Sequence, residues 1–148
     1  MPSRPLILAD LPALHALDQR CFPPGIAYSQ AEIAAALRHP QGFHRGAEEG
    51  GRLAAFILTQ PRGRYGHVIT VDVEADFRRQ GLGEELMRAA EEHYRGRGAS
   101  GMLLEAAVNN AGALAFYSRL GYRVERTLPG YYAEDLDGLR LRIEFAGT

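Results

Sequence analysis

Residues 71–83 have the sequence Val-Asp-Val-Glu-Ala-Asp-Phe-Arg-Arg-Gln-Gly-Leu-Gly, and they join an apolar segment to an amphipathic one. This order predicts a strand that ends at Val73, a turn that carries glycine, and the start of a helix. The first turn of a helix has backbone N–H groups without intrahelical partners, and its dipole favours an anion. Arg78 and Arg79 add donors for phosphate oxygens. The segment is therefore a candidate phosphate site.

The spacing of the glycines separates this loop from two common nucleotide motifs. Gly81-Leu82-Gly83 lacks the third glycine of the dinucleotide fingerprint, and the Gly-Lys-Ser/Thr of a P-loop is missing. A Gly-x-Gly pair by itself also occurs in tight turns. The longer spacing Arg-x-x-Gly-x-Gly, from Arg78 to Gly83, is more specific.

The segments after the loop predict a crossover between two strands. Apolar residues between Leu82 and Arg95 recur every four positions, which predicts a helix with one face in the core. Residues 102–106 are an apolar run typical of a buried strand, and Asn110 can cap a short helix after it. Because a helix links residues 67–73 to this strand, the two strands are expected to run parallel, with a right-handed crossover.

The segments before the loop predict antiparallel pairing. Residues 6–8 are expected to form a first strand, and Asp10 to cap the helix that follows. Ser29 and Glu32 have the spacing of a capping box at the start of a second helix. Further strands are expected at residues 43–47, 53–59, 122–127 and 139–145. The fold class is thus α/β (α+β), with a mixed sheet and helices on both faces, in a single domain that spans residues 1–148.

Composition excludes several classes of function. The formal net charge of −1 argues against non-specific binding of nucleic acid. Cys21 is the single cysteine, and the five histidines contain no His-x-x-x-His pair, so we expect no metal site. No segment approaches the roughly 20 apolar residues of a membrane span, and the N-terminus has no long apolar region. We therefore expect a cytoplasmic protein with neither a nucleic-acid nor a membrane partner.

Residues 71–83 resemble the acetyl-CoA motif of the GNAT superfamily of N-acetyltransferases. Residues 110–117, Asn-Ala-Gly-Ala-Leu-Ala-Phe-Tyr, and residues 120–122, Leu-Gly-Tyr, resemble its C-terminal motif, in the same order and at the same separation. The resemblance extends over most of the chain. It implies the GNAT fold, in which a mostly antiparallel sheet is splayed between two parallel strands, and it implies acetyl-CoA as the co-substrate.

Within the superfamily the chain is most similar to the RimI-type acetyltransferases, which modify ribosomal proteins or other peptide N-termini. The features that carry this similarity are Phe22-Pro23 before Tyr28-Ser29, Leu104-Glu105, Asn110 with Tyr117, and Tyr131-Tyr132.

The resemblance also implies how acetyl-CoA is held. The pantetheine arm lies in the gap between the parallel strands like an added strand, bonded by the backbone of Val71 and Val73. The pyrophosphate lies on backbone N–H groups of the loop. The cofactor site so implied contains Val71, Val73, Arg78, Arg79, Gln80, Gly81, Leu82, Gly83, Glu84, Asn110 and Tyr117. Glu84 departs from RimI-like chains, which often have a basic residue there, and its carboxylate repels a phosphate unless the side chain turns outward.

Acetyl transfer needs a neutral amine and a protonated leaving thiolate. Glu105 aligns with the glutamate of the RimI-like motif and is the first candidate for the base, acting through a water molecule. His67 is the alternative base, on the strand that faces the gap, and Asp72 is a third candidate. Tyr117 is the candidate acid. A backbone N–H near Val73 is expected to polarise the acetyl carbonyl.

Tyr28, Tyr131 and Tyr132 are the candidate residues for binding the acceptor. The rigid loop that ends at Tyr28 and the acidic run 134–137 are expected to flank the mouth, where the acids could attract a cationic amine. The acceptor is expected to be a protein N-terminus. A small-molecule amine, or a non-catalytic acyl-CoA-binding regulator, remains an alternative, and the chain is expected to be a monomer or a homodimer.

Overall fold

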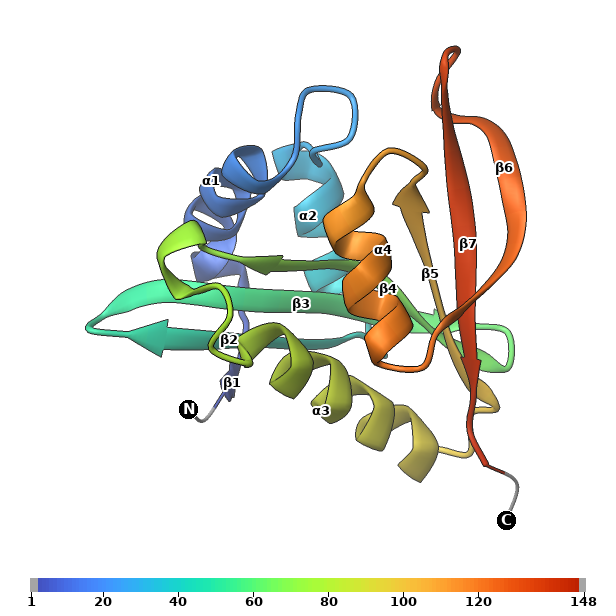
Figure 1. The fold of residues 1–148 in the computed structure, drawn as a ribbon. Helices are drawn as coiled ribbons and strands as arrows, with labels where there is room; N and C mark the ends of the chain where they lie inside the picture. The colour runs from blue at the N-terminus through green and yellow to red at the C-terminus, as the bar shows by residue number, and fades with distance from the viewer. Residues whose placement is uncertain (1–2, 147–148) are drawn as a thin grey trace.

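The computed structural model describes residues 3–146 and has a seven-stranded sheet in the order β1-β2-β3-β4-β5-β7-β6. The strands are β1 (Ser3–Pro5), β2 (Phe43–Glu49), β3 (Arg52–Arg62), β4 (Tyr65–Val73), β5 (Gly101–Ala107), β6 (Arg123–Ala133) and β7 (Leu136–Glu144). Only β4 and β5 pair in parallel within the described chain, and the other neighbours are antiparallel. The predicted mixed sheet is therefore confirmed (Figure 1).

β4 and β5 pair over four residues and then separate. Their register runs from Tyr65 opposite Gly101 to Val68 opposite Leu104. Beyond this point β4 stays paired with β3, and β5 stays paired with β7, so the sheet opens into two halves (Figure 1). The register of β4 on β3 also shifts here and leaves Ile69 as an extra, bulged residue. The splay between the parallel strands is thus confirmed.

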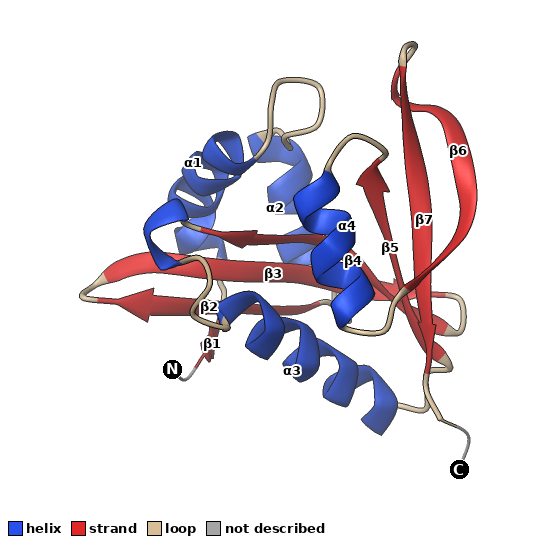
Figure 2. Cartoon of the chain, viewed as in Figure 1, coloured by secondary structure: helices blue, strands red, loops and turns tan. Residues whose placement is uncertain are grey.

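Helices cover both faces of the sheet, as predicted (Figure 2). They are α1 (Leu11–Cys21), α2 (Gln30–Arg38), α3 (Leu82–Gly96) and α4 (Ala111–Arg119), with short 3₁₀ turns η1 (Leu8–Asp10) and η2 (Ala75–Phe77). α1 and α2 pack on Phe56 and Leu58, whereas α3 and α4 pack on the opposite face around Ile57 and Leu104. None of the helices in residues 3–146 is long and apolar enough to cross a membrane.

Helices α2 and α4 begin where the sequence predicts because their capping residues act as expected. In α2, the Ser29 hydroxyl accepts the Glu32 N–H, and the Glu32 carboxylate accepts the Ser29 N–H in return. In α4, the Asn110 side chain accepts the Ala113 N–H. Such a cap typically stabilises a helix by about 1 kcal/mol. It also fixes the position of Asn110 at the edge of the candidate site.

The prediction for the N-terminal segment was wrong in two respects. The first strand is Ser3–Pro5, and Leu8 to Asp10 form the turn η1 instead of strand 6–8. Asp10 does not cap α1, because its own backbone is already helical and its carboxylate accepts the N–H of Ile7 and pairs with Arg4. Ile7 is 62% exposed, so apolar character alone did not place this segment in the sheet.

The closing hairpin is longer than the sequence predicts. The expected strands 122–127 and 139–145 are the ends of β6 and β7, which continue to Ala133 and Leu136 at the turn. The pairing is irregular between Leu128 and Ala133, where Pro129 and Gly130 interrupt the strand pattern. Tyr131 and Tyr132 therefore lie within β6 and not in a turn before the last strand.

Candidate active site

A cleft of about 1010 Å³ lies where β4 and β5 separate. Its walls come from β4, from β5, from the loop and first turn of α3, and from α4. The segment after α1, residues 21–28, and the aromatic part of β6 close the opposite end. The cleft thus contains almost every residue that the sequence predicts for the site. Gln80 and His67 are the exceptions, because neither contributes to the lining.

The start of α3 is built to accept an anion. Gly81 is the residue before the helix, with a φ of 81° that favours glycine, and no side chain caps the first turn. The N–H groups of that turn therefore remain available for a ligand. Gly83 is buried, and a Cβ there would lie 3.1 Å from the Phe116 ring. Glycine at this position lets the start of α3 approach α4 closely.

The two arginines of the loop differ in what they contact. Arg78 turns back, so that its Nε donates to the Val73 carbonyl at 3.0 Å and its guanidinium lies 3.8 Å from the Cys21 sulfur. Arg79 is exposed and has a φ of 67°, which costs a non-glycine residue on the order of 1 kcal/mol. Arg78 therefore stabilises the loop, whereas Arg79 has no hydrogen-bond or ion-pair partner among the described residues.

Glu84 lines the cleft, but its side chain points along the helix. Its carboxylate lies 3.9 Å from the Arg88 guanidinium, one turn further into α3, and 58% of the side chain is exposed. An exposed pair of this kind stabilises a helix by a few tenths of a kcal/mol. The outward turn that sequence analysis required of Glu84 is thus the conformation observed.

The edge of β4 that faces the cleft has no neighbouring strand beyond Val68. Val71 and Val73 pair with β3 on one side and line the cleft, but the parallel pairing with β5 ends at Val68. Backbone N–H and C=O groups at such an edge need partners. An extended ligand with amide groups can supply them, as the sequence analysis expects of a pantetheine arm.

Glu105 and His67, the two main candidates for the base, contact each other. His67 Nε2 lies 2.6 Å from Glu105 Oε1, and Arg140 Nε donates to Glu105 Oε2 at 3.1 Å. The Glu105 side chain is only 6% exposed and lines the cleft, whereas His67 lies behind it. A carboxylate can only accept a hydrogen bond, so His67 Nε2 carries the hydrogen that joins them.

The surroundings of Glu105 keep it ionised. Burial on its own raises the pKa of Glu105, but the hydrogen bonds and charges of His67 and Arg140 outweigh it and leave the pKa below its usual value. Arg62 adds a second arginine at 3.8 Å. The group that faces the cleft is therefore a carboxylate fixed in place by His67 and two arginines.

Tyr117 faces the cleft from α4 and is suited to donate a proton. It is 8% exposed, and its hydroxyl makes no hydrogen bond to another residue in the described chain. Burial raises its pKa above the ordinary value, helped by the nearby Asp72 and Tyr132. The phenol thus keeps its proton until a partner needs it. Asn110 lines the same wall while it caps α4.

Three tyrosines lie at the end of the cleft beside Glu105. Tyr28, Tyr131 and Tyr132 all line it, and the charge of Glu105 raises the pKa of each, secondary to burial. The rings of Tyr131 and Tyr132 meet edge to face at 4.9 Å between centroids. Tyr28 is fixed by its hydroxyl, which donates to the carbonyl of the bulged Ile69 at 3.1 Å. The structure therefore brings the predicted acceptor tyrosines together.

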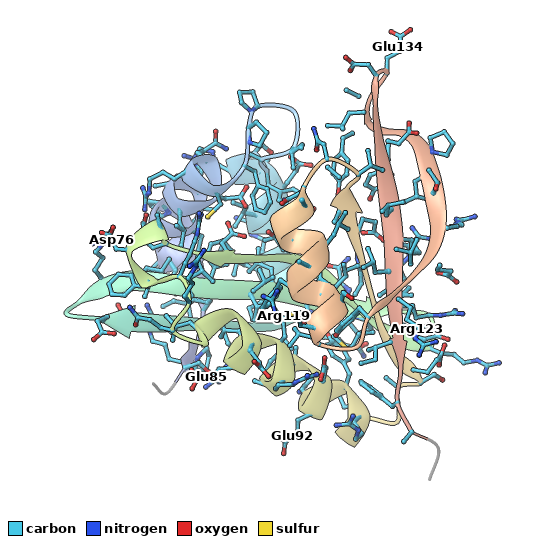
Figure 3. All side chains as sticks on the ribbon, in the orientation of Figure 1. Asp76, Glu85, Glu92, Arg119, Arg123 and Glu134 are labelled. Atoms are coloured by element: carbon cyan, nitrogen blue, oxygen red, sulfur yellow. The ribbon has the colours of Figure 1, made fainter. Side chains whose placement is uncertain are left out.

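The acidic run at the tip of the hairpin does not face these tyrosines. Glu134 lies at the far end of the β6–β7 turn and points away from the cleft (Figure 3). Asp137 accepts the N–H of Gly130 at 2.8 Å and so belongs to the hairpin itself. The hairpin is longer than predicted and carries Glu134 outward, so the attraction of a cationic acceptor by these acids stays a prediction.

The comparison with known proteins agrees with this geometry. Residues 11–122 match the model of the acetyltransferase (GNAT) family. The chain belongs to this family. It is 30% identical over 130 residues to the [ribosomal protein bS18]-alanine N-acetyltransferase of Escherichia coli, a match that covers 87% of this chain and 84% of the relative.

Two further comparisons place the chain within the GNAT family. The catalytic subunit of the N-terminal acetyltransferase B complex of Arabidopsis thaliana is 32% identical over 110 residues, 71% of this chain and 63% of that subunit. The crystal structure of the ribosomal-protein-S18-alanine N-acetyltransferase from Escherichia coli has a TM-score of 0.86 at 26% identity, and covers 99% of this chain and 96% of that chain. The resemblance to RimI-type enzymes is thus confirmed, and the chain is an N-acetyltransferase of the GNAT family.

The residues present fit acetyl-CoA, the donor that the GNAT family uses. The open first turn of α3 suits a phosphate, the free edge of β4 suits a chain with amides, and Gly83 leaves room beside Phe116. Each feature is a property of the fold and does not depend on a particular side chain. Glycine spacing and strand order predicted a phosphate site from the residues alone, whereas acetyl-CoA as its ligand was implied by the resemblance to the GNAT family.

Two residues at or beside the cleft had not been predicted from the sequence. Arg119, at the end of α4, lines the cleft and makes no ion pair in the described chain (Figure 3). Its only sequence signal was its position two residues after Tyr117. Asp18 is fully buried on α1, next to Leu14 and Leu17. A carboxylate on the apolar face of a helix was the signal available for it.

Proposed function

We propose that this acetyltransferase transfers the acetyl group of acetyl-CoA directly to the α-amine of a protein or peptide N-terminus. The observation that carries the proposal is the position of Glu105. Glu105 lies in the cleft as a carboxylate fixed by His67 and Arg140. Its strand, β5, faces the donor edge of β4 across the splay. The tyrosines at this end of the cleft are Tyr28, Tyr131 and Tyr132.

The chemistry follows from the two sides of the splay. The amine nitrogen attacks the acetyl carbonyl carbon, the N–C bond forms, and the C–S bond to coenzyme A breaks. Glu105 takes the proton of the attacking amine, through a water molecule. Tyr117 gives its proton to the sulfur of the leaving group, the proton on the Glu105 side leaves to solvent, and Tyr117 recovers a proton from solvent, so the cycle closes with no net change of protons. His67 keeps Glu105 in place and connects it to the surface.

An α-amine suits this site because the base is weak. A peptide α-amine has a reference pKa near 8, and a lysine amine one near 10.4, so the α-amine is neutral far more often at neutral pH. Glu105, with its lowered pKa, cannot deprotonate a lysine ammonium effectively. The relative that acts on an alanine of protein bS18, and the relative from the N-terminal acetyltransferase B complex, support the same acceptor class.

The proposal predicts which acceptors turn over. Release of coenzyme A is measured with acetyl-CoA and three acceptor sets: peptides with free N-termini, the same peptides N-terminally blocked but containing lysine, and small amines such as a polyamine or an aminoglycoside. We expect turnover only with the free N-termini. Turnover confined to small amines, or binding of acetyl-CoA without turnover on any acceptor, would contradict the proposal.

Variants test the assigned roles. We expect Tyr117→Phe and Glu105→Gln each to lower kcat by about 10²-fold or more while the Kd of acetyl-CoA changes little, since general acid–base catalysis contributes about 10²–10⁴-fold. Tyr65→Phe is the matched control, because the Tyr65 hydroxyl binds Glu144 outside the cleft. If His67→Ala loses activity while Glu105→Gln stays fully active, His67 is the base instead.

A further inference from the structure

Two aspartates with almost no solvent exposure lie between α1 and β4, beside the cleft. The exposed fraction is 0% for Asp18 on α1 and 1% for Asp72 on β4, and Asp72 also contributes to the lining. Burial of a carboxylate is costly unless the group is paired or neutral. The partners of these two groups therefore decide their charge.

Each of the two carboxyl groups has one oxygen with a donor and one without. Asp18 Oδ2 accepts the backbone N–H of Tyr28 at 2.7 Å, and Asp72 Oδ1 accepts the hydroxyl of Thr70. Asp18 Oδ1 and Asp72 Oδ2 are buried and have no donor among the described residues. Asp18 on α1 and Asp72 on β4 lie where these two elements pack together, and each carboxyl group acts on the other there. One proton between these two oxygens satisfies both.

The groups that face the pair favour retention of that proton. Burial raises the pKa of Asp72 well above its ordinary value, and the neighbouring Asp18 raises it further. The Thr70 hydroxyl and the Arg78 guanidinium act in the opposite direction without cancelling the increase. The remaining titratable neighbours of Asp72, Cys21 on α1 and Tyr117 on α4, are uncharged, since their own pKa values are raised.

We propose that Asp18 and Asp72 share a single proton, and that this acid–carboxylate pair positions Tyr28 and the acceptor loop, residues 23–28, against β4. The effect on the acceptor rests on the function proposed above, whereas the shared proton does not. The pair acts through Tyr28 and does not itself touch the reacting atoms.

The position of Tyr28 gives the pair its functional weight. Its N–H is held by Asp18, its carbonyl accepts the Gln19 side chain at 3.0 Å, and its hydroxyl donates to Ile69 at the β4 bulge. The pair thus joins α1 and the acceptor loop to the strand that lines the donor side. If both aspartates are charged, their repulsion separates α1 from β4 and displaces Tyr28, which weakens acceptor binding and leaves the donor loop intact.

The shared proton has a signature in the pH dependence of stability. An unfolded aspartate loses its proton near pH 3.9, whereas the folded pair keeps one to a higher pH. Folding therefore takes up a proton, and the stability it provides is lost as pH rises toward the pKa of the pair. The unfolding equilibrium constant rises by up to about tenfold per pH unit in that window.

Amide substitutions test for one shared proton. In Asp72→Asn the amide N–H₂ occupies the place of the shared proton and donates to Asp18, so this variant mimics the native pair without titrating. Asp18→Asn donates to Asp72 in the same way and still accepts from Tyr28. The double variant places two N–H₂ groups face to face. We therefore expect each single variant to fold and the double variant to be less stable than the sum of the two predicts.

The experiment compares wild type with Asp18→Asn, Asp72→Asn, the double variant and Asp72→Ala. For each protein, urea unfolding is measured from about pH 5 to about pH 9. The kcat and KM for a peptide with a free N-terminus are measured as well. Asp135→Asn is the control, an exposed aspartate at the hairpin tip. We expect the unfolding equilibrium constant of wild type to rise more steeply with pH than that of Asp72→Asn. Asp135→Asn should behave like wild type. We also expect Asp72→Ala to raise the peptide KM about tenfold more than Asp72→Asn does, while acetyl-CoA binding changes little in both.

Parallel pH dependence of wild type and Asp72→Asn would overturn the shared proton. A peptide KM that rises as much in Asp72→Asn as in Asp72→Ala would overturn the positioning role. If no peptide is acetylated at all but the pH dependence differs as expected, the function proposed above fails and the shared proton stands. The two inferences can therefore fail separately.

Discussion

Glu105 shows how burial and charge compete at a single residue. Burial favours its neutral form, whereas His67 and Arg140 favour the carboxylate, and the second effect wins. A carboxylate with a lowered pKa is a poor proton acceptor in water, but it is always available and always in the same place. Catalysis here therefore depends on position and on an amine that is already partly neutral, more than on basicity.

The first prediction concerns the pKa of this carboxylate. Replacement of Arg140 by Gln removes a charged hydrogen bond, so burial is less opposed and the pKa of Glu105 rises. In a plot of log(kcat/KM) against pH, the acid limb has slope 1 where only the amine gains a proton and steepens toward slope 2 where Glu105 gains one as well. We expect this steepening to occur at a pH about one unit higher in Arg140→Gln than in wild type. Such a bond contributes on the order of 1.5 kcal/mol, and one pKa unit equals about 1.4 kcal/mol.

Arg142→Gln is the control for this measurement. Arg142 lies two residues along the same strand and pairs with Glu125 and Glu144 outside the cleft. The sign can also be checked in the fold, because a lowered carboxyl pKa stabilises the native state at pH above about 4.3 and the effect is lost as pH falls further. An unchanged acid limb in Arg140→Gln would show that Arg140 does not set the state of Glu105.

At the scale of elements, the start of α3 and the end of α4 face each other across the donor end of the cleft. α3 offers free N–H groups and the exposed Arg79, and α4 offers Arg119, while Glu84 is turned toward Arg88. Arg78, the first arginine of the motif, is already bonded to Val73. Arg119, like Arg79, is therefore a cation available to supplement the helix start when a phosphate binds.

The second prediction is that Arg119→Gln weakens coenzyme A binding by about tenfold, the scale of one charge-assisted hydrogen bond. Titration calorimetry with coenzyme A and 3′-dephospho-coenzyme A identifies the phosphate. If Arg119 binds the 3′-phosphate, the loss disappears with the dephospho ligand, and if it binds the pyrophosphate, the loss is equal for both. Arg123→Gln is the control, an exposed arginine outside the cleft (Figure 3). Equal affinities for wild type and Arg119→Gln would contradict the prediction.

How far the sequence predicts an element depends on whether its determinants are local. The capping box at Ser29, the cap at Asn110 and the spaced apolar face of α3 are local signals, and all three helices were predicted correctly. The N-terminal segment and the closing hairpin were not, because the ion pair from Arg4 to Asp10 and the irregular pairing around Pro129 follow neither a capping pattern nor an apolar period.

The same distinction applies to the site. The donor loop could be predicted because glycine spacing and a strand–turn–helix order are contiguous in sequence. The contact between His67 and Glu105 joins two strands 38 residues apart, and the buried Asp18 meets Asp72 across α1 and β4. These pairs depend on the parallel register of β4 on β5 and on the packing of α1, neither of which is visible in a local pattern.

At the scale of the whole molecule, the cleft separates two halves of one sheet. β1 to β4 form one half and β5 to β7 the other, and they share only the short parallel pairing from Tyr65 to Val68 (Figure 1). A ligand that lies along β4 and contacts the starts of α3 and α4 adds contacts where the sheet has fewest. Donor binding should therefore stabilise the fold as a whole and should protect the edges of the splay.

The last prediction follows from this arrangement. A ligand that binds only the native state stabilises it by about 2.7 kcal/mol at 100 times its Kd, which raises the Tm of a chain of this size by roughly 5–10 °C. We expect acetyl-CoA to give this shift, and amide hydrogen exchange to slow in residues 81–86, at the start of α3, and in the part of β4 beyond Val68. The antiparallel pairs β1–β2 and β6–β7 should gain protection only in step with global stability. Beyond Val68, β5 no longer pairs with β4, so backbone groups of β4 are left without a strand partner. A pantetheine arm bound along β4 must shield these groups from exchange. A Tm shift without protection at this edge would therefore mean that the donor does not occupy the splay.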